Sequence, residues 1–145
     1  GSPGSGKTTL LRDLIRQISN HGVGSVAVVD EREEIFPKVH EQFCFTTGRR
    51  TDVLSGCDKK QGIDIVLRSM GPAVIALDEI TAQEDCNALL HAGWCGVKLL
   101  ATAHAGNRKD LFQRPIYRPI LEKKIFDTLL ILHPDKSWHL ERLEV

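Results

Sequence analysis

The residues GSPGSGKTTLLRDLIRQ, at positions 1–17, decide the fold class of this 145-residue chain. The first eight of them match G-x-x-x-x-G-K-[ST], the pattern of a phosphate-binding P-loop or Walker A motif. Glycines let the backbone curl tightly enough to aim several N–H groups at one phosphate group. A helix that begins at Thr8 adds the positive end of its dipole. The stretch therefore predicts a loop that holds nucleotide phosphates.

Two side chains of this motif have predicted roles of their own. Lys7 is expected to reach the β- and γ-phosphates as a mobile point charge, and so to take part in catalysis. The hydroxyl of Thr8 is expected to bind Mg²⁺. The predicted nucleotide-binding residues of the loop are Gly1, Ser2, Pro3, Gly4, Ser5, Gly6, Lys7, Thr8 and Thr9. The alternative interpretation is an ordinary glycine-rich turn before a helix.

A second motif is AVIALDE at residues 73–79, an apolar run that ends in two carboxylates. Such a run predicts a buried strand, and open parallel sheets bind ligands at the carboxyl ends of their strands. We expect Asp78 to hold Mg²⁺ directly or through water, as in a Walker B motif. We expect Glu79 to polarise the attacking water. Acidic residues often end strands without a function, so this prediction depends on the P-loop that precedes it.

Two further strand ends are expected to face the same edge of the sheet. Val28–Val29 is followed by Asp30 and Glu31, either of which we predict to join the metal or water shell. Thr102 or His104, after the apolar residues 97–101, is predicted to sense the γ-phosphate. The alternatives are a solvated charge cluster and an ordinary polar strand end.

An arginine from a neighbouring subunit often stabilises the charge that develops on a transferred phosphoryl group. The candidates in this chain are Arg49, Arg50, Arg68, Arg114 and Arg118. The sequence does not select one of them, and a solvated surface arginine is the ordinary interpretation of each.

Helical and extended patterns alternate along the chain, which predicts a layered α/β domain with a mostly parallel sheet. We expect helices at 8–19, 63–70 and 81–92, the last opened by a capping box at Thr81–Glu84. Strands are expected at 25–29, 73–77 and 97–101, with mostly loop at 36–58. Segments 126–132 and 138–145 predict an antiparallel hairpin with a bulge or partial exposure. P-loops follow a buried strand, so we expect residues 1–145 to be one ATPase domain of a longer protein, without its first strand and any N-terminal domain.

The overall composition argues against several other classes of protein. The 19 basic and 19 acidic residues cancel, so no strong field favours nucleic acid, which we do not expect as a partner. No apolar run approaches the roughly 20 residues that span a bilayer. The four cysteines form no C-x-x-C pair, which favours reduced thiols in a cytosol. His91 and Cys95 share a helix face, where ordinary packing is a better interpretation than a metal site.

With these motifs in place, the chain resembles the stage III sporulation AA family, relatives of the bacterial secretion ATPases in the RecA-like P-loop class. The resemblance covers essentially all 145 residues. Residues 1–16 and 68–80 match patterns that many P-loop ATPases share. The family-specific stretches are VAVVDEREEI at 26–35, GRRTDVLSGCDKKQGI at 48–63 and HAGWCGVKLLATAHAG at 91–106.

The resemblance implies ATP binding through the P-loop, with the pair at 78–79 as the second motif. It also implies acidic and histidine boxes near the γ-phosphate, which Asp30–Glu31 and His104 match. In the family, the protein is thought to energise a channel between mother cell and forespore. A homo-oligomeric ring, membrane channel proteins as partners, and a cytoplasmic place at the inner face of a membrane are implied in turn.

The first functional hypothesis is therefore a Mg²⁺-dependent ATPase that works as an oligomer, with ATP and Mg²⁺ as its ligands. One alternative is a nucleotide-dependent binding switch without turnover, and another is a small-molecule kinase, although no segment predicts an arginine-rich lid. A GTPase is disfavoured because the chain has no [NT]-K-x-D motif in a suitable context.

Overall fold

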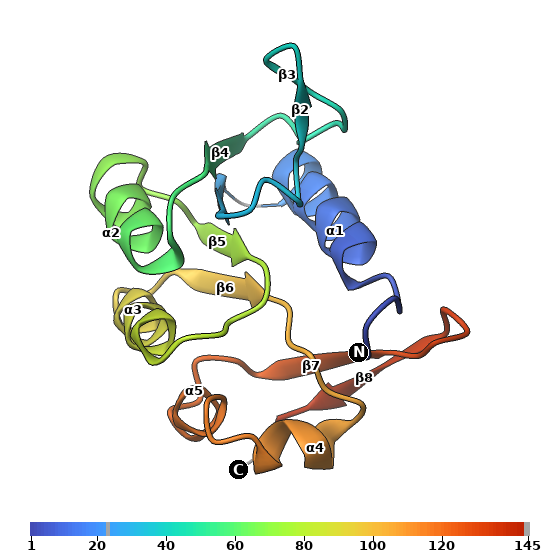
Figure 1. Cartoon of the computed structure of the whole chain (residues 1–145). Coiled ribbons are helices and arrows are strands. Elements are labelled where there is room, and N and C mark those ends of the chain that lie inside the picture. The colour runs from blue at the N-terminus through green and yellow to red at the C-terminus, as the bar shows by residue number, and fades with distance from the viewer. Residues whose placement is uncertain (23, 144–145) are drawn as a thin grey trace.

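Four short strands form a parallel sheet in the order β4–β1–β5–β6 in the computed structural model, which describes residues 1–22 and 24–143 (Figure 1). They are β1 (Val26–Asp30), β4 (Thr51–Ser55), β5 (Val74–Leu77) and β6 (Lys98–Ala101). Val29 pairs with Leu77 and Leu77 pairs with Ala101, so these three strands end at the same level. Residues that follow the strands therefore gather at a single edge of the sheet.

Helices cover both faces of this sheet (Figure 1). On one face, α1 (Lys7–His21) packs Leu11 and Ile15 against Val26 and Val28. On the other face, α2 (Lys59–Ser69) and α3 (Gln83–Trp94) pack against the alternate strand residues, including Ala27, Val29, Ile75 and Leu77. Because successive side chains of a strand point to opposite faces, strands covered on both sides are apolar throughout. This explains the continuous apolar runs of the sequence.

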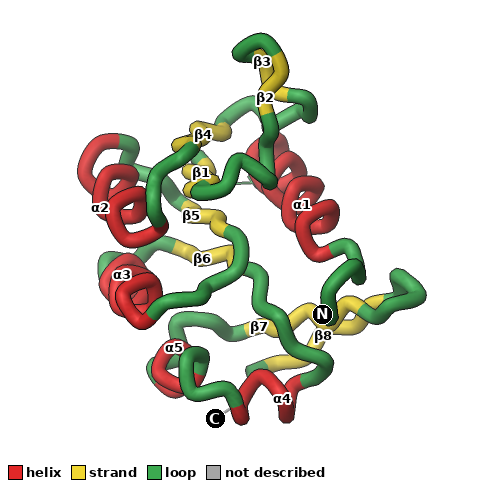
Figure 2. The backbone as a smooth tube through the Cα atoms, viewed as in Figure 1, coloured by secondary structure: helices red, strands yellow, loops and turns green. Residues whose placement is uncertain are grey.

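Smaller elements surround the sheet. A two-stranded hairpin, β2 (Lys38–Val39) and β3 (Gln42–Phe43), extends away from the sheet beside α1 (Figure 2). After β6 come α4 (Arg108–Gln113) and α5 (Arg118–Glu122). The chain then forms the antiparallel hairpin of β7 (Thr128–Leu132) and β8 (Trp138–Arg142).

The predicted α/β class, parallel sheet and C-terminal hairpin are confirmed, as is the partial exposure of its second strand, but one local prediction is wrong and β4 is a strand that the sequence did not predict. The segment predicted as mostly loop contains β4, which pairs with β1 along its whole length. The capping box does not form, because α3 has Ala82 at its N-cap and no side-chain cap hydrogen bond. Pairing between β7 and β8 is regular from Thr128–Arg142 to Leu132–Trp138, so the alternative of partial exposure holds in place of a bulge.

The helices are also too short or too polar to cross a bilayer. Within residues 1–22 and 24–143, none combines the length and the apolar character that a membrane-spanning helix needs.

Candidate functional site

The glycine-rich loop at residues 1–6 leads directly into α1. Gly4 and Gly6 have φ angles of +74° and +99°, in the left-handed region that favours glycine. Gly6 is the N-cap of α1, and no side chain caps this helix end. The first N–H groups of a helix have no partner within the helix. The loop thus presents backbone donors and a positive helix end, and the side chain of Lys136 lies beside it, with Nζ donating to the carbonyl of Gly4 at 2.8 Å.

Backbone contacts attach this loop to the sheet edge where the strands end. The amide of Ala105 donates to the carbonyl of Gly1 at 3.3 Å, and the amino group of Gly1 lies 3.5 Å from the carbonyl of Ala103. Both partners follow the end of β6. Because β5 ends beside β6, the pair at 78–79 lies at the same edge as the loop. The two predicted motifs are therefore brought together, as the sequence analysis expects.

The interior of the loop is narrow and carries an unpaired polar atom. A Cβ atom at Gly1 would lie 2.5 Å from Ser5 Oγ and 2.8 Å from the carbonyl oxygen of Leu132, so only glycine fits there. Ser5 is 1% exposed, and its hydroxyl has no hydrogen-bond partner. Lys7 Nζ donates to the carbonyls of Gly1 and Ser2, at 2.9 and 3.4 Å. The lysine ammonium therefore lies over the loop from which it comes.

Asp78, which follows β5, belongs to a charged cluster that sequence reasoning missed. Lys59, the first residue of α2, places its Nζ 3.4 Å from Asp78 Oδ1 and 2.6 Å from Glu31 Oε2. Asp78 Oδ1 is buried and lacks a hydrogen-bond partner. Burial raises the pKa of Asp78, and the charge of Lys59 opposes this only in part. The Asp-Lys-Lys sequence at 58–60 carries no signal that one lysine is buried.

Asp30, predicted for the metal or water shell, has a different role. Its carboxylate accepts backbone N–H groups of Glu34, Ile35 and Phe36, at 3.1, 3.1 and 2.9 Å. The side chain is completely buried. Because of these contacts, the Asp30 side chain points into the loop after β1 and holds the backbone of that loop in place. Of the predicted pair, Glu31 is the one that contacts the Asp78 cluster, through Lys59.

Glu79 belongs to a second group, on the side of α4 and α5. Arg114 and Tyr117 both have raised pKa values, mainly because of a hydrogen bond to Asp110 for the arginine and because of burial for the tyrosine. The charge of Glu79 adds to the rise in both pKa values. Arg114 forms an ion pair with Asp110 at 3.2 Å. Among the candidate arginines, Arg114 is therefore the one whose charge is coupled to Glu79 within the same chain.

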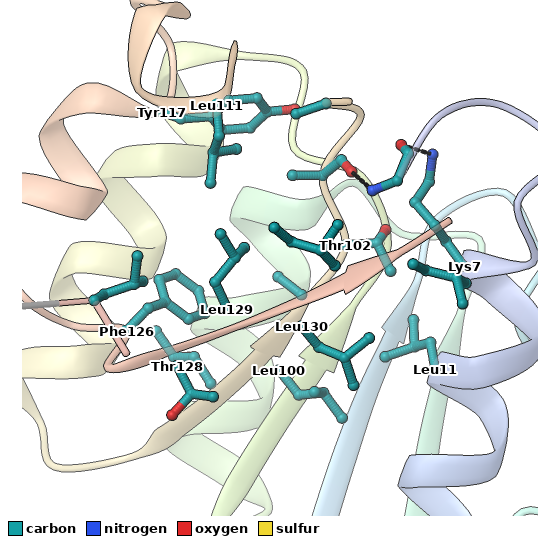
Figure 3. Close-up of a pocket in the computed structure, with 18 of the residues that line it drawn as sticks. Lys7, Leu11, Leu100, Thr102, Leu111, Tyr117, Phe126, Thr128, Leu129 and Leu130 are labelled. Atoms are coloured by element: carbon teal, nitrogen blue, oxygen red, sulfur yellow. Dashed lines mark hydrogen bonds between the residues drawn. The ribbon is translucent and has the colours of Figure 1, made fainter. Parts of the chain in front are cut away.

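The two predicted phosphate sensors lie in different surroundings. Thr102 lines the same pocket as Lys7 (Figure 3). His104 lies near Asp110, whose pKa is lowered chiefly by the amide of Gly106, then by Arg114 and more weakly by His104. Both side chains are half-buried at the edge of the sheet. Geometry therefore associates Thr102 with the glycine-rich loop and His104 with the group around Glu79.

A pocket of about 400 Å³ opens between β6 and β7. Its walls are mostly apolar, and Figure 3 shows Leu11, Leu100 and Leu130 among them, with Lys7 at one end. Apart from Lys7 and a few polar groups such as Thr102, these walls offer few donors for phosphate oxygens, so we do not assign the pocket to a nucleotide. It lies beside the outer edge of β6, which pairs only with β5 among the described strands.

Protein ligands alone do not form a metal cage in the described part of the chain. No group of three or more His, Cys, Asp or Glu side chains is arranged around a common point there. Cys95 Sγ lies 3.9 Å from His91 Nε2 in an exposed pair. Mg²⁺ in nucleotide sites needs only one or two protein ligands beside phosphates and water, so Thr8 and Asp78 suit that kind of site.

Comparisons with solved structures define the class of fold. The VirB11 ATPase of the Brucella suis type IV secretion system, solved with sulphate, matches 98% of this chain and 45% of its own, with a TM-score of 0.66 at 18% identity. The Legionella pneumophila ATPase DotB matches 98% of this chain and 43% of its own, with a TM-score of 0.61 at 18% identity. The domain thus has the RecA-like fold of these secretion ATPases.

Sequence comparisons place the chain within that class. It belongs to the family described as "Sporulation stage III, protein AA", whose model matches residues 1–139. Stage III sporulation protein AA of Bacillus subtilis (strain 168) is 40% identical over 142 residues, which cover 94% of this chain and 46% of that protein. The uncharacterized protein ycf45 of Cyanidium caldarium is 29% identical over 98% of this chain and 44% of its own length. The chain therefore spans about half the length of these relatives.

Proposed function

We propose that this domain binds ATP with Mg²⁺ and hydrolyses it, supplying energy to a complex that works during sporulation. One observation carries the proposal: a loop with left-handed glycines and an uncapped helix end lies at the same sheet edge as Asp78 and Glu79. Backbone N–H groups at a helix start suit phosphate oxygens, and carboxylates suit the metal and the water.

The side chains at the edge fit Mg²⁺ with a nucleotide. Ser5 Oγ is buried inside the loop and has no hydrogen-bond partner, which is costly unless a ligand or water satisfies it. Asp78 keeps 13% of its side chain exposed for a metal ion, while its buried Oδ1 lies 3.4 Å from the ammonium of Lys59. Thr8 lies in the first turn of α1, beside the loop. We assign Thr8 and Asp78 to the metal, which would neutralise charge on the phosphate oxygens.

Each residue at this edge of the sheet would have its own role in the reaction. Lys7 exchanges its loop carbonyl contacts for the β- and γ-phosphates, where its charge opposes the charge that builds up during transfer. Glu79 accepts a hydrogen bond from the attacking water and orients it in line. We propose that either Thr102, which lines the same pocket as Lys7, or His104, on the Glu79 side, senses the γ-phosphate.

The family relation supports a place in sporulation, and the fold relation supports an oligomeric motor. DotB and VirB11 are named as ATPases, and VirB11 as part of a secretion system. By analogy, we propose a ring of subunits that acts on membrane proteins of a sporulation channel.

The test is release of inorganic phosphate from ATP by the purified protein. Glu79→Gln should lower turnover by about 100-fold or more while ATP still binds, because a positioned base contributes roughly that factor. Lys7→Ala should instead weaken ATP binding. Lys109→Ala, at an exposed position of α4, is the control and should match the parent.

The possible results separate the functional classes. If Glu79→Gln hydrolyses ATP as fast as the parent, the assigned base is wrong. If ATP binds tightly and no phosphate is released even at concentrations that favour oligomers, the domain is a switch. A phosphorylated acceptor in place of free phosphate would identify a kinase.

A further inference from the structure

Lys59 occupies a position that is unfavourable for a lysine in two ways. It is the first residue of α2, where the positive end of the helix dipole disfavours a cation. It is also 1% exposed, although lysine side chains normally keep their ammonium group in water. The neighbouring Lys60 is exposed on the same helix turn. Something specific must therefore stabilise the buried ammonium of Lys59.

Two carboxylates from adjacent strands provide this stabilisation. Lys59 Nζ donates to Glu31 Oε2 at 2.6 Å and lies 3.4 Å from Asp78 Oδ1. Glu31 follows β1, and Asp78 follows β5, which pairs directly with β1. Burial by itself would lower the pKa of Lys59, but the bond to Glu31 and the charges of Asp78 and Asp85 outweigh it. The lysine is therefore a cation that bridges two strand ends.

The contact of Lys59 with Asp78 differs from its contact with Glu31 in distance and in the exposure of the carboxylate. Asp78 Oδ1 is within ion-pair distance of the ammonium but makes no hydrogen bond. The Asp78 side chain is 13% exposed and Oδ1 is buried, so its exposed surface lies on its other atoms. Glu31 holds the lysine at shorter range and is more exposed, at 36%. Lys59 is thus held more closely by Glu31 than by Asp78.

We propose that Lys59 is a positioning residue for the metal–nucleotide site: it holds the Asp78 carboxylate with Oδ1 turned inward and leaves the exposed part of this side chain free at the sheet edge where the glycine-rich loop is attached. The inference rests on the proposed function, because it assumes that Asp78 serves a divalent cation. It adds a residue that neither acidic motif contains. Partners that orient a metal ligand typically change metal affinity by about 10- to 100-fold when they are removed.

The experiment separates the metal contribution from nucleotide binding itself. A fluorescent ATP analogue is titrated into the protein in EDTA and at increasing Mn²⁺, which replaces Mg²⁺ as the probe. The readouts are the affinity without metal and the Mn²⁺ concentration that gives half of the metal-dependent increase. Parent protein is compared with Lys59→Met, Lys59→Arg and the adjacent exposed control Lys60→Met.

We expect Lys59→Met to raise the half-maximal Mn²⁺ concentration by about 10-fold or more, with affinity in EDTA unchanged. Lys59→Arg keeps the charge but not the fit of the buried ammonium, so we expect about a threefold increase. Lys60→Met should equal the parent. Thermal unfolding of each variant establishes that it is folded, and if Lys59→Met is not, the result for Lys59→Arg decides.

Opposite outcomes overturn the inference. An unchanged or lower Mn²⁺ requirement in the folded Lys59 variant would mean that the lysine only neutralises charge, since removal of a cation by itself favours a second cation. Failure of the proposed function looks different, because the parent protein would then show no binding of the analogue or no response to Mn²⁺.

Discussion

Replacement of Asp30 tests whether this carboxylate acts on the fold or on the nucleotide. Its oxygens accept three backbone N–H groups of the loop after β1, and the side chain is 0% exposed. Two residues of that loop, Ile35 and Phe36, are themselves fully buried in the core under α1. Asp30→Ala would leave the donors unpaired and release the backbone that carries these two side chains.

The expected loss follows from the number of bonds. A hydrogen bond to a charged group contributes about 1.5–3 kcal/mol, and the three bonds share one carboxylate, so they are not additive. We expect Asp30→Ala to lower the free energy of unfolding by about 3–5 kcal/mol, a large part of the 5–15 kcal/mol typical of a domain. Asp30→Asn keeps one acceptor oxygen and should lose about half as much.

Urea unfolding followed by circular dichroism measures this loss, with Arg32→Ala as the control. Arg32 is exposed in the same loop, and its replacement should change stability by no more than about 0.5 kcal/mol. The structural role is refuted if Asp30→Ala costs less than about 1 kcal/mol while nucleotide affinity collapses. That combination of results would support the role in the metal or water shell that the sequence predicts for Asp30.

Two further predictions concern Asp78 and Gly62. Burial raises the pKa of Asp78, so the folded state binds this proton more tightly than the unfolded state, and the parent loses stability as pH rises above 3.8, the ordinary aspartate value. Asp78→Asn removes this dependence. We therefore expect the melting temperature of Asp78→Asn to rise relative to that of the parent between acid and neutral pH. A difference in melting temperature that does not change with pH would contradict the assignment. A Cβ at Gly62 would lie 2.5 Å from Val29 Cγ1 in the core. Gly62→Ala should therefore destabilise by about 1–2 kcal/mol in urea unfolding, although alanine is the better helix former by about 1 kcal/mol. Lys60→Ala in the same helix is the control. If Gly62→Ala stabilises the protein, the core around Val29 can shift to make room for the added methyl group.

The elements that the sequence predicts well are those whose signal is local. The glycine-rich loop and the strand before Asp78 each carry their pattern within eight residues, and the structure brings both to one sheet edge. β4 has no such signal, because it lies at the outer edge of the sheet and its residues are only partly buried. Its pairing with β1 comes from tertiary structure, which overrides a weak propensity.

The candidate site shows the same division between local and distant signals. Positions 78 and 79 follow from a strand that ends in carboxylates. The burial of Lys59 depends on bringing the start of α2 against the ends of β1 and β5, and no spacing rule predicts this contact. Asp30 shows the converse, because a carboxylate at a strand end looks like a ligand until its three backbone partners are known.

The apolar pocket beside β6 connects the fold to the site. Strands of a parallel sheet are covered on both faces and paired on both edges unless they lie at the rim, and an exposed edge favours further pairing. The pocket beside the outer edge of β6 has mostly apolar walls, and β7 lies on its other side. The backbone of Gly1 bonds to Ala103 and Ala105, just beyond β6, so the glycine-rich loop is attached to the sheet beside this pocket. A loop that is attached to the sheet by these bonds at one end and continues into α1 at the other has little freedom left, and we expect that rigidity to keep several N–H groups aimed at one phosphate.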